Sequence, residues 1–127
     1  MCNTIFGLQH GFGRFAPSDR VMLFSRFSFD ASVWQVFGAL GFGATLVIRS
    51  RDVGATIKEH SVTHMHLVPS VLANLDPADY PSLRYVQAGG EPCPLPLAQL
   101  WASQVATFVN SYDIQLCPGC SSLSVFR

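Results

Sequence analysis

Charged side chains are scarce in this sequence, and long apolar runs are missing from it. Only 13% of its 127 residues are charged, and eight basic residues balance eight acidic ones, so the formal net charge is zero. Because no basic stripe is present, nucleic-acid binding is not expected. The longest apolar stretch, residues 36–48, is interrupted by glycines. It is shorter than the roughly 20 residues that a membrane span requires, so no membrane association is expected.

The four cysteines form no regular framework, and the N-terminus does not resemble a secretory signal. Cysteine occurs at positions 2, 93, 117 and 120. Residues 1–7 lack a basic start followed by a long apolar core. We therefore interpret the cysteines as free thiols of a cytoplasmic protein. Cys117 and Cys120 have C-x-x-C spacing, which leaves a redox or zinc role open, although zinc requires a second pair of ligands.

Apolar residues make up 49% of the chain, enough for one well-formed core. Strand-like and helix-like segments alternate along the sequence. This alternation predicts an α/β fold in which βα units form a mostly parallel sheet of about five strands flanked by helices. Because the strands lack polar alternation, burial on both faces is expected. The predicted strands are 20–25, 44–48, 63–68, 83–88 and 106–112, and the predicted helices are 31–40, 53–60, 70–75 and 96–104.

Several polar or glycine-rich positions fall at or just after the predicted strand ends. They are Asp30, the Pro69-Ser70 pair, the turn 89–91 and Tyr112. Ligands of parallel α/β sheets bind beyond the carboxyl ends of the strands. One crevice is therefore expected to collect these residues.

Asp30 stands between an aromatic segment and a predicted amphipathic helix. The apolar residues of that helix, at helical spacing, are Val33, Trp34, Phe37 and Leu40. The position is typical of a helix N-cap, whose carboxylate accepts backbone hydrogen bonds. A buried carboxylate there would instead select a cationic ligand, because an unpaired buried charge is costly.

The stretch Ser28-Phe29-Asp30-Ala31-Ser32-Val33-Trp34 resembles the amino-acid recognition motif of the adenylation domains of non-ribosomal peptide synthetases. These domains belong to the adenylate-forming, AMP-dependent synthetase/ligase superfamily. Two later segments, residues 83–91 and 108–112, follow in the family's order. The resemblance covers about Pro17 to Tyr112. It implies that residues 1–112 are part of the large N-terminal subdomain of an adenylation domain and that residues 113–127 are an atypical tail.

The resemblance also implies roles for individual residues. Asp30 would bind the α-amino group of the substrate. The glycine turn and Tyr112 would sandwich the adenine of ATP, and Asn110 would hydrogen-bond it. The implied amino-acid pocket comprises Asp30, Ala31, Trp34, His66, Val86, Ala88 and Ser111. The implied nucleotide site comprises Gly89, Gly90, Glu91, Asn110 and Tyr112.

Enzymes of the resembling family activate an amino acid with ATP and Mg²⁺ as an aminoacyl-adenylate. They then transfer it to the phosphopantetheine thiol of a carrier domain, in secondary metabolite biosynthesis. Here the Ser/Thr/Gly-rich phosphate loop is absent, and Gln115 and Leu116 replace the family's Thr and magnesium-binding Glu. The catalytic Lys of the family lies beyond the chain's end. We therefore expect a truncated fragment that does not form adenylates alone or bind ATP and Mg²⁺ productively.

Other interpretations of these residues stay open. Tyr112 has the position of a strand-end core residue. His64 and His66, two apart on a strand, have the spacing of half a metal site, with no further ligand placed to complete it. An alternative interpretation is that the whole chain is a fragment of an acyl-CoA synthetase-like ligase. The substrates of those enzymes have no α-amino group that Asp30 could bind. A non-catalytic protein that binds a small ligand or a partner is the third possibility.

Overall fold

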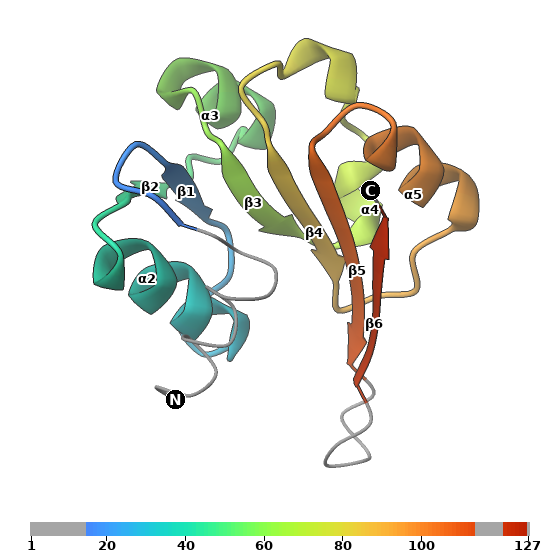
Figure 1. Cartoon of the computed structure of the whole chain (residues 1–127), viewed down its shortest axis with the longest axis horizontal. Helices are drawn as coiled ribbons and strands as arrows, with labels where there is room; N and C mark the ends of the chain where they lie inside the picture. Colours follow the sequence, from blue (N-terminus) through green and yellow to red (C-terminus); the bar gives the residue numbers. More distant parts are fainter. Residues whose placement is uncertain (1–14, 114–120, 127) are drawn as a thin grey trace. The chain divides into compact units, whose positions relative to one another are not determined.

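A computed structural model describes residues 15–113 and 121–126, with side chains described for 15–111. The chain divides into two compact units, Met1–Met65 and His66–Arg127 (Figure 1). Strands alternate with helices in both units. The fold class is therefore α/β with parallel strands and flanking helices, as predicted.

The N-terminal unit is built on parallel strands. Strand β1 (Arg20–Leu23) lies between β2 (Thr45–Ile48) and the first residues of β3 (His64–Leu67), and it is parallel to both. Helix α2 (Ala31–Gly41) follows β1 and packs against β1 and β2. Helix α3 (Val53–His60) follows β2, with the bounds that the sequence predicts.

The core of this unit gathers around Phe15. Its ring lies 6.2 Å from the ring of Trp34 and 6.3 Å from the ring of Phe42, measured between centroids. A Cβ on Gly38 would lie 2.8 Å from the Phe15 ring, so α2 approaches the core closely only because this residue has no side chain. The buried members of the cluster are Phe15, Val21, Ala39 and Ala44.

The apolar stripe predicted for the helix after Asp30 is only partly buried in α2. Val33 and Trp34 are half-buried, and Trp34 packs against the Phe15 cluster, whereas Phe37 and Leu40 are 50% and 59% exposed. Small and polar residues complete the buried face, because Phe15 fills the space beneath the helix and leaves no room for a large side chain at Gly38. The buried residues of α2 are Ser32, Gln35, Gly38 and Ala39.

The C-terminal unit contains β4 (Tyr85–Gly89) and β5 (Thr107–Asp113), which are parallel. Strand β6 (Ser121–Phe126) pairs with β5 in antiparallel fashion, and Figure 1 shows the three strands side by side. Helix α4 (Pro69–Leu72) packs against β4, and α5 (Leu95–Ala102) packs against β5. A short 3₁₀ helix, η1, spans Pro77–Asp79. Fully buried side chains of this core include Leu72, Val86, Trp101 and Phe108.

One expectation about the strands needs correction, and one strand was missed. β2 is not buried on both faces: Ile48 is 73% exposed and Thr45 is also exposed, because β2 is the outer strand of its unit. β6 was missed because the tail after residue 113 was interpreted as atypical sequence, although Leu123, Ser124 and Val125 alternate as strand residues do. The remaining predicted strands and helices are present, with ends that shift by one to three residues.

Candidate functional site

Strands β4 and β5 end side by side, and the predicted site residues of the second unit lie at these carboxyl ends. The register pairs Ala88 with Asn110 and Gly89 with Ser111. The strands are parallel, so their carboxyl ends open on the same sheet edge, where α/β proteins bind ligands.

Gly89 brings His66 and Ser111 together. A Cβ at this position would lie 2.7 Å from His66 Nε2 and 2.8 Å from Ser111 Oγ. No real Cβ tolerates contacts this short, so the two polar side chains meet across a position that only glycine can occupy. His66 and Ser111 are both half-buried.

Gln87 is a residue of this cluster that the sequence did not single out. Its Nε2 donates to Ser111 Oγ over 2.9 Å, and Ser111 Oγ donates to the Ala88 carbonyl over 3.3 Å. The Tyr85 hydroxyl donates to Gln87 Oε1 over 3.3 Å. Burial raises the pKa of the Tyr85 hydroxyl above its ordinary range, which keeps it a neutral donor. Strand alternation puts Tyr85, Gln87 and Gly89 on one face of β4, but it does not by itself mark Gln87 as a site residue.

Val86 and Ala88 do not join this cluster. Both are 0% exposed. Alternation along β4 puts them on the opposite face of the strand from Gln87 and Gly89. The structure therefore places these two predicted pocket residues in the core of the unit.

Glu91 ties the turn after β4 to the start of α4. Its Oε2 accepts the backbone N–H of Ser70 over 3.1 Å, and its Oε1 accepts the Ser70 hydroxyl over 3.1 Å. The turn passes through Gly90 in the left-handed region, with φ +84°. Ser70 lies inside α4, which begins one residue before the predicted start, at Pro69. Proline is suited to that first position since it needs no N–H partner.

Asn110 carries a buried polar atom without a partner. Its Oδ1 is buried, and no group among the described residues donates a hydrogen bond to it. Such orphaned acceptors are rare in folded proteins because each costs free energy. Asn110 lies in the middle of β5, and an acceptor there that lacks a donor is suited to a ligand N–H. Tyr112 belongs to β5, but its side chain lies outside the description.

The predicted pocket residues of the first unit lie at the start of α2. Asp30 is the N-cap of the helix, and its Oδ1 accepts the Ala31 N–H over 2.8 Å. Its side chain is exposed, and Ala31 and Trp34 are half-buried. The N-cap interpretation of Asp30 is therefore confirmed, and it leaves the second carboxylate oxygen open to solvent.

His64 belongs to a hydrogen-bonded group rather than to a metal cluster. Its Nδ1 lies 2.9 Å from Thr63 Oγ1 and 3.9 Å from Asp19 Oδ1. Within residues 15–113 and 121–126, no group of three or more His, Cys, Asp or Glu side chains is placed to hold a metal ion.

Cys93 is a free thiol, and partial burial raises its pKa. The other three cysteines, with the Cys117–Cys120 pair, lie outside the described residues, as do Gln115 and Leu116. No helix in the described part of the chain has the length and apolar character to cross a membrane.

The chain belongs to the AMP-binding enzyme family, whose model matches residues 1–113. It is 36% identical over 114 residues to tyrocidine synthase 2 of Brevibacillus parabrevis, a match that covers 84% of this chain and 3% of the relative. It is 39% identical over 92 residues to an adenylate-forming reductase of Coprinopsis cinerea, covering 70% of this chain and 9% of that protein. The chain thus spans less than a tenth of these relatives.

Among solved structures, the adenylation domain AlmE of Vibrio cholerae, crystallised with glycyl-adenosine-5'-phosphate, has a similar fold. The TM-score is 0.83 at 26% sequence identity, and the match covers 98% of this chain and 26% of AlmE. The predicted family and fold are confirmed by these comparisons.

Proposed function

We propose that this chain supplies the amino-acid and adenine contacts of an adenylation domain that activates an amino acid with ATP. Residues 1–112 would form this part, and residues 113–127 would be its atypical C-terminal tail. In the proposed reaction a substrate carboxylate oxygen attacks the α-phosphorus of ATP. A new P–O bond forms, and the bond to pyrophosphate breaks. The aminoacyl group would then pass to a phosphopantetheine thiol of a carrier domain, in the cytoplasm.

The buried, unpartnered Oδ1 of Asn110 is the observation that carries the nucleotide part. It lies in the residue paired with Ala88, one position before the Gly89-Gly90 turn. An adenine amino group would donate to it, and the turn lets backbone approach the flat base. Glu91 would hold the turn in place through Ser70. Tyr112, the next residue but one along β5, would stack on the other face of the base.

Asp30 is proposed as the partner of the substrate α-ammonium group. Its exposed carboxylate uses one oxygen for the helix cap, so the other can accept a ligand N–H. Ala31 and Trp34 are proposed as further substrate contacts beside Asp30, and His66 and Ser111 as substrate contacts of the C-terminal unit. Val86 and Ala88 lie in the core of that unit and would act only by supporting β4. ATP in the family acts with Mg²⁺. The described residues offer no cluster of ligands for that ion by themselves.

Binding of AMP and ATP, measured by calorimetry with and without pooled amino acids, tests the proposal. Parent protein should bind AMP, and Asn110→Leu should weaken that binding by about tenfold or more, the loss expected for one unpaired polar contact. Asp30→Ala should leave AMP binding intact and remove any effect of amino acids. Equal AMP affinity in parent and Asn110→Leu would overturn the nucleotide assignment. Enhancement by simple carboxylic acids that lack an amino group would overturn the role of Asp30.

A further inference from the structure

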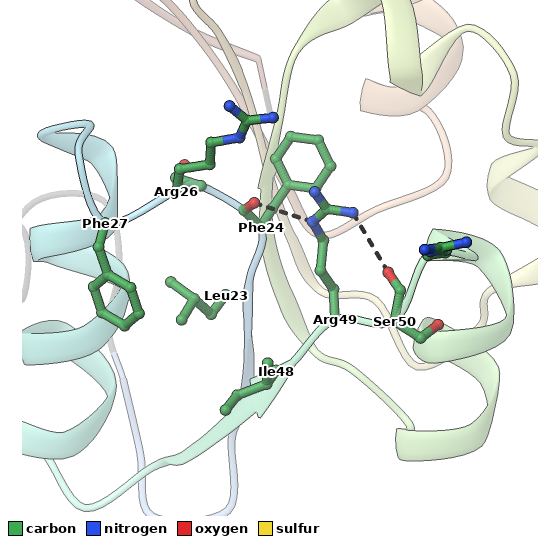
Figure 2. A pocket seen from close by; sticks show the side chains of 9 residues that line it. Leu23, Phe24, Arg26, Phe27, Ile48, Arg49 and Ser50 are labelled. Atoms are coloured by element: carbon green, nitrogen blue, oxygen red, sulfur yellow. Dashed lines mark hydrogen bonds between the residues drawn. The ribbon is translucent and has the colours of Figure 1, made fainter.

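A pocket of about 510 Å³ lies where β1 and β2 end in the N-terminal unit (Figure 2). It is formed by the residues that follow each strand, so it opens at the carboxyl ends of two parallel strands. That edge is the usual place for ligands in α/β folds. Its lining residues are Leu23, Phe24, Ser25, Arg26, Phe27, Ile48, Arg49, Ser50 and Arg51.

Positive charge is concentrated in this pocket. Three of the chain's eight basic residues line it, Arg26, Arg49 and Arg51, and no carboxylate does. In a chain of zero net charge this is an uneven distribution. Within the described residues none of the three guanidinium groups forms an ion pair.

The nearest carboxylates along the sequence are already engaged. Asp30 accepts the Ala31 N–H over 2.8 Å and caps α2. Asp52 accepts the Ala55 N–H over 2.9 Å and caps α3. Neither acid lines the pocket, and among the described residues neither forms an ion pair with its arginines.

Arg49 is held in a fixed orientation. Its Nε donates to the Phe24 carbonyl over 3.1 Å, and one terminal nitrogen donates to the Ser50 carbonyl over 3.4 Å. Its guanidinium lies over the Phe24 ring, 4.7 Å from the centroid, as Figure 2 shows. Such a stacked and anchored guanidinium loses little entropy when its remaining N–H groups bind an anion.

The opposite wall of the pocket is apolar. Figure 2 shows Leu23, Phe27 and Ile48 together on the side away from Arg49. Phe27 and Ile48 are 78% and 73% exposed, so this apolar surface is open to a ligand. A ligand that fits both walls carries a multiply charged group and an apolar body.

We propose that this pocket binds an organic phosphate. The phosphoryl oxygens of the ligand accept hydrogen bonds from Arg26, Arg49 and Arg51. The carbon skeleton of the ligand packs against Leu23, Phe27 and Ile48. A phosphate dianion suits the three unpaired guanidiniums better than a single carboxylate, because its oxygens accept several forked hydrogen bonds at once. These residues belong to the N-terminal unit, whereas Asn110 belongs to the C-terminal unit, and the proposal does not depend on adenylation activity.

The test is titration of the full 127-residue chain with phenyl phosphate, inorganic phosphate and benzoate, followed by NMR of the arginine Nε–H and backbone amides. Phenyl phosphate should shift the signals of residues 23–27 and 48–51. It should bind several-fold more tightly than either inorganic phosphate, which lacks the apolar body, or benzoate, which carries one charge. Binding should weaken as salt is raised.

Substitutions distinguish specific binding of the phosphate in the pocket from nonspecific attraction of an anion to basic residues. Arg49→Gln and Arg51→Gln should each weaken phenyl phosphate binding about tenfold. Lys58→Gln, which removes the same charge on α3 outside the pocket, should leave it unchanged. Ile48→Ser should weaken phenyl phosphate but not inorganic phosphate. All these side chains are exposed, so each variant should keep the parent's circular dichroism.

Three results would each overturn the proposal. One is the absence of shifts at the pocket residues. Another is equal weakening by Lys58→Gln and Arg49→Gln, which would mean attraction by charge alone. The third is equal affinity for benzoate and phenyl phosphate, which would assign the pocket to carboxylates. Asn110→Leu should have no effect on phenyl phosphate, which keeps this test distinct from that of the adenine site.

Discussion

The carboxylate of Glu91 holds Ser70 through two hydrogen bonds, one to its backbone N–H and one to its hydroxyl, each 3.1 Å long. The two residues are 21 positions apart, so this contact joins the turn after β4 to the first turn of α4. It fixes the Gly89-Gly90 turn from outside, without occupying the ligand edge of the strands.

A double-mutant cycle measures this contact. Ser70→Ala and Glu91→Ala should each lower the free energy of unfolding. The coupling energy between them should be about 1 kcal/mol, the low end for a charged hydrogen bond because the pair is partly exposed. Glu59→Ala, an exposed glutamate on α3, is the matched control and should change stability little. Additive effects of the two substitutions would mean that the contact does not form in solution.

Gly89→Ala should be strongly destabilising. The new Cβ would press on His66 Nε2 and Ser111 Oγ and would also lie 3.0 Å from the Ser111 carbonyl, a backbone atom that cannot move aside. We expect a loss of roughly 1–3 kcal/mol in the free energy of unfolding, measured by urea titration.

Gly41→Ala is the control for that substitution. Nothing lies within 4 Å of a Cβ at Gly41, and the residue is the last of α2. Alanine should be neutral there or stabilising by about 0.5 kcal/mol, because it reduces the freedom of the unfolded chain. If Gly89→Ala and Gly41→Ala lower the free energy of unfolding by similar amounts, then a Cβ at Gly89 does not clash with His66 and Ser111.

The fold was largely predictable because its signals are local. The helix Val53–His60 has an Asp N-cap, a basic last turn and a following residue, Ser61, in the left-handed conformation, and its bounds were predicted without error. The buried face of α2 was not predictable. It depends on Phe15, an aromatic residue distant in sequence that fills the space under Gly38. Such tertiary contacts override the apolar periodicity of a single helix.

The candidate site was predicted only in part, for a similar reason. Residues in short motifs, such as Gly89 and Asn110, were found from local sequence. Gln87 was missed because a single glutamine on a strand carries no signal until its partner, Ser111, is placed opposite it. The pairing of Glu91 with Ser70 was missed because it joins two loops 21 residues apart.

Tyr85 should make the stability of the protein fall at alkaline pH. Its side chain is 4% exposed, and burial raises the pKa of its hydroxyl in the folded state. The unfolded chain ionises first, near pH 10, so stability is complete below that pH and is lost as the pH rises further. The slope should approach about 1.4 kcal/mol per pH unit. Tyr85→Phe should remove this component from unfolding curves recorded between pH 8 and 11, and an identical slope in that variant would assign the loss to other groups.

Asn110 should contribute to AMP binding but not to the free energy of unfolding. Its Oδ1 is buried without a partner, so Asn110→Leu removes an unsatisfied acceptor at similar volume. The free energy of unfolding should stay the same or rise by up to about 1 kcal/mol, while AMP binding weakens by about tenfold or more. Asn74, whose Nδ2 donates to the Ser70 carbonyl over 2.8 Å, provides the contrast, since Asn74→Leu should lower stability. A clear loss of stability in Asn110→Leu would mean that its acceptor is satisfied within the protein.

The exposed apolar residues of α2 should cause self-association. Phe37 and Leu40 are 50% and 59% exposed on one helix, and a net charge of zero provides no repulsion between chains. The double substitution Phe37→Gln and Leu40→Gln should raise the concentration at which the protein sediments as a monomer. Because both side chains face solvent, the free energy of unfolding should change by no more than about 0.5 kcal/mol.

Ala39→Gln is the control for this last prediction, since Ala39 lies on the buried face of the same helix and is 0% exposed. It should lower stability by overpacking the core and should not improve solubility. Sedimentation velocity over a range of concentrations distinguishes the two faces of α2. If the double variant associates as strongly as the parent, then the association surface lies elsewhere, with the exposed Ile48 of the outer strand β2 as the next candidate.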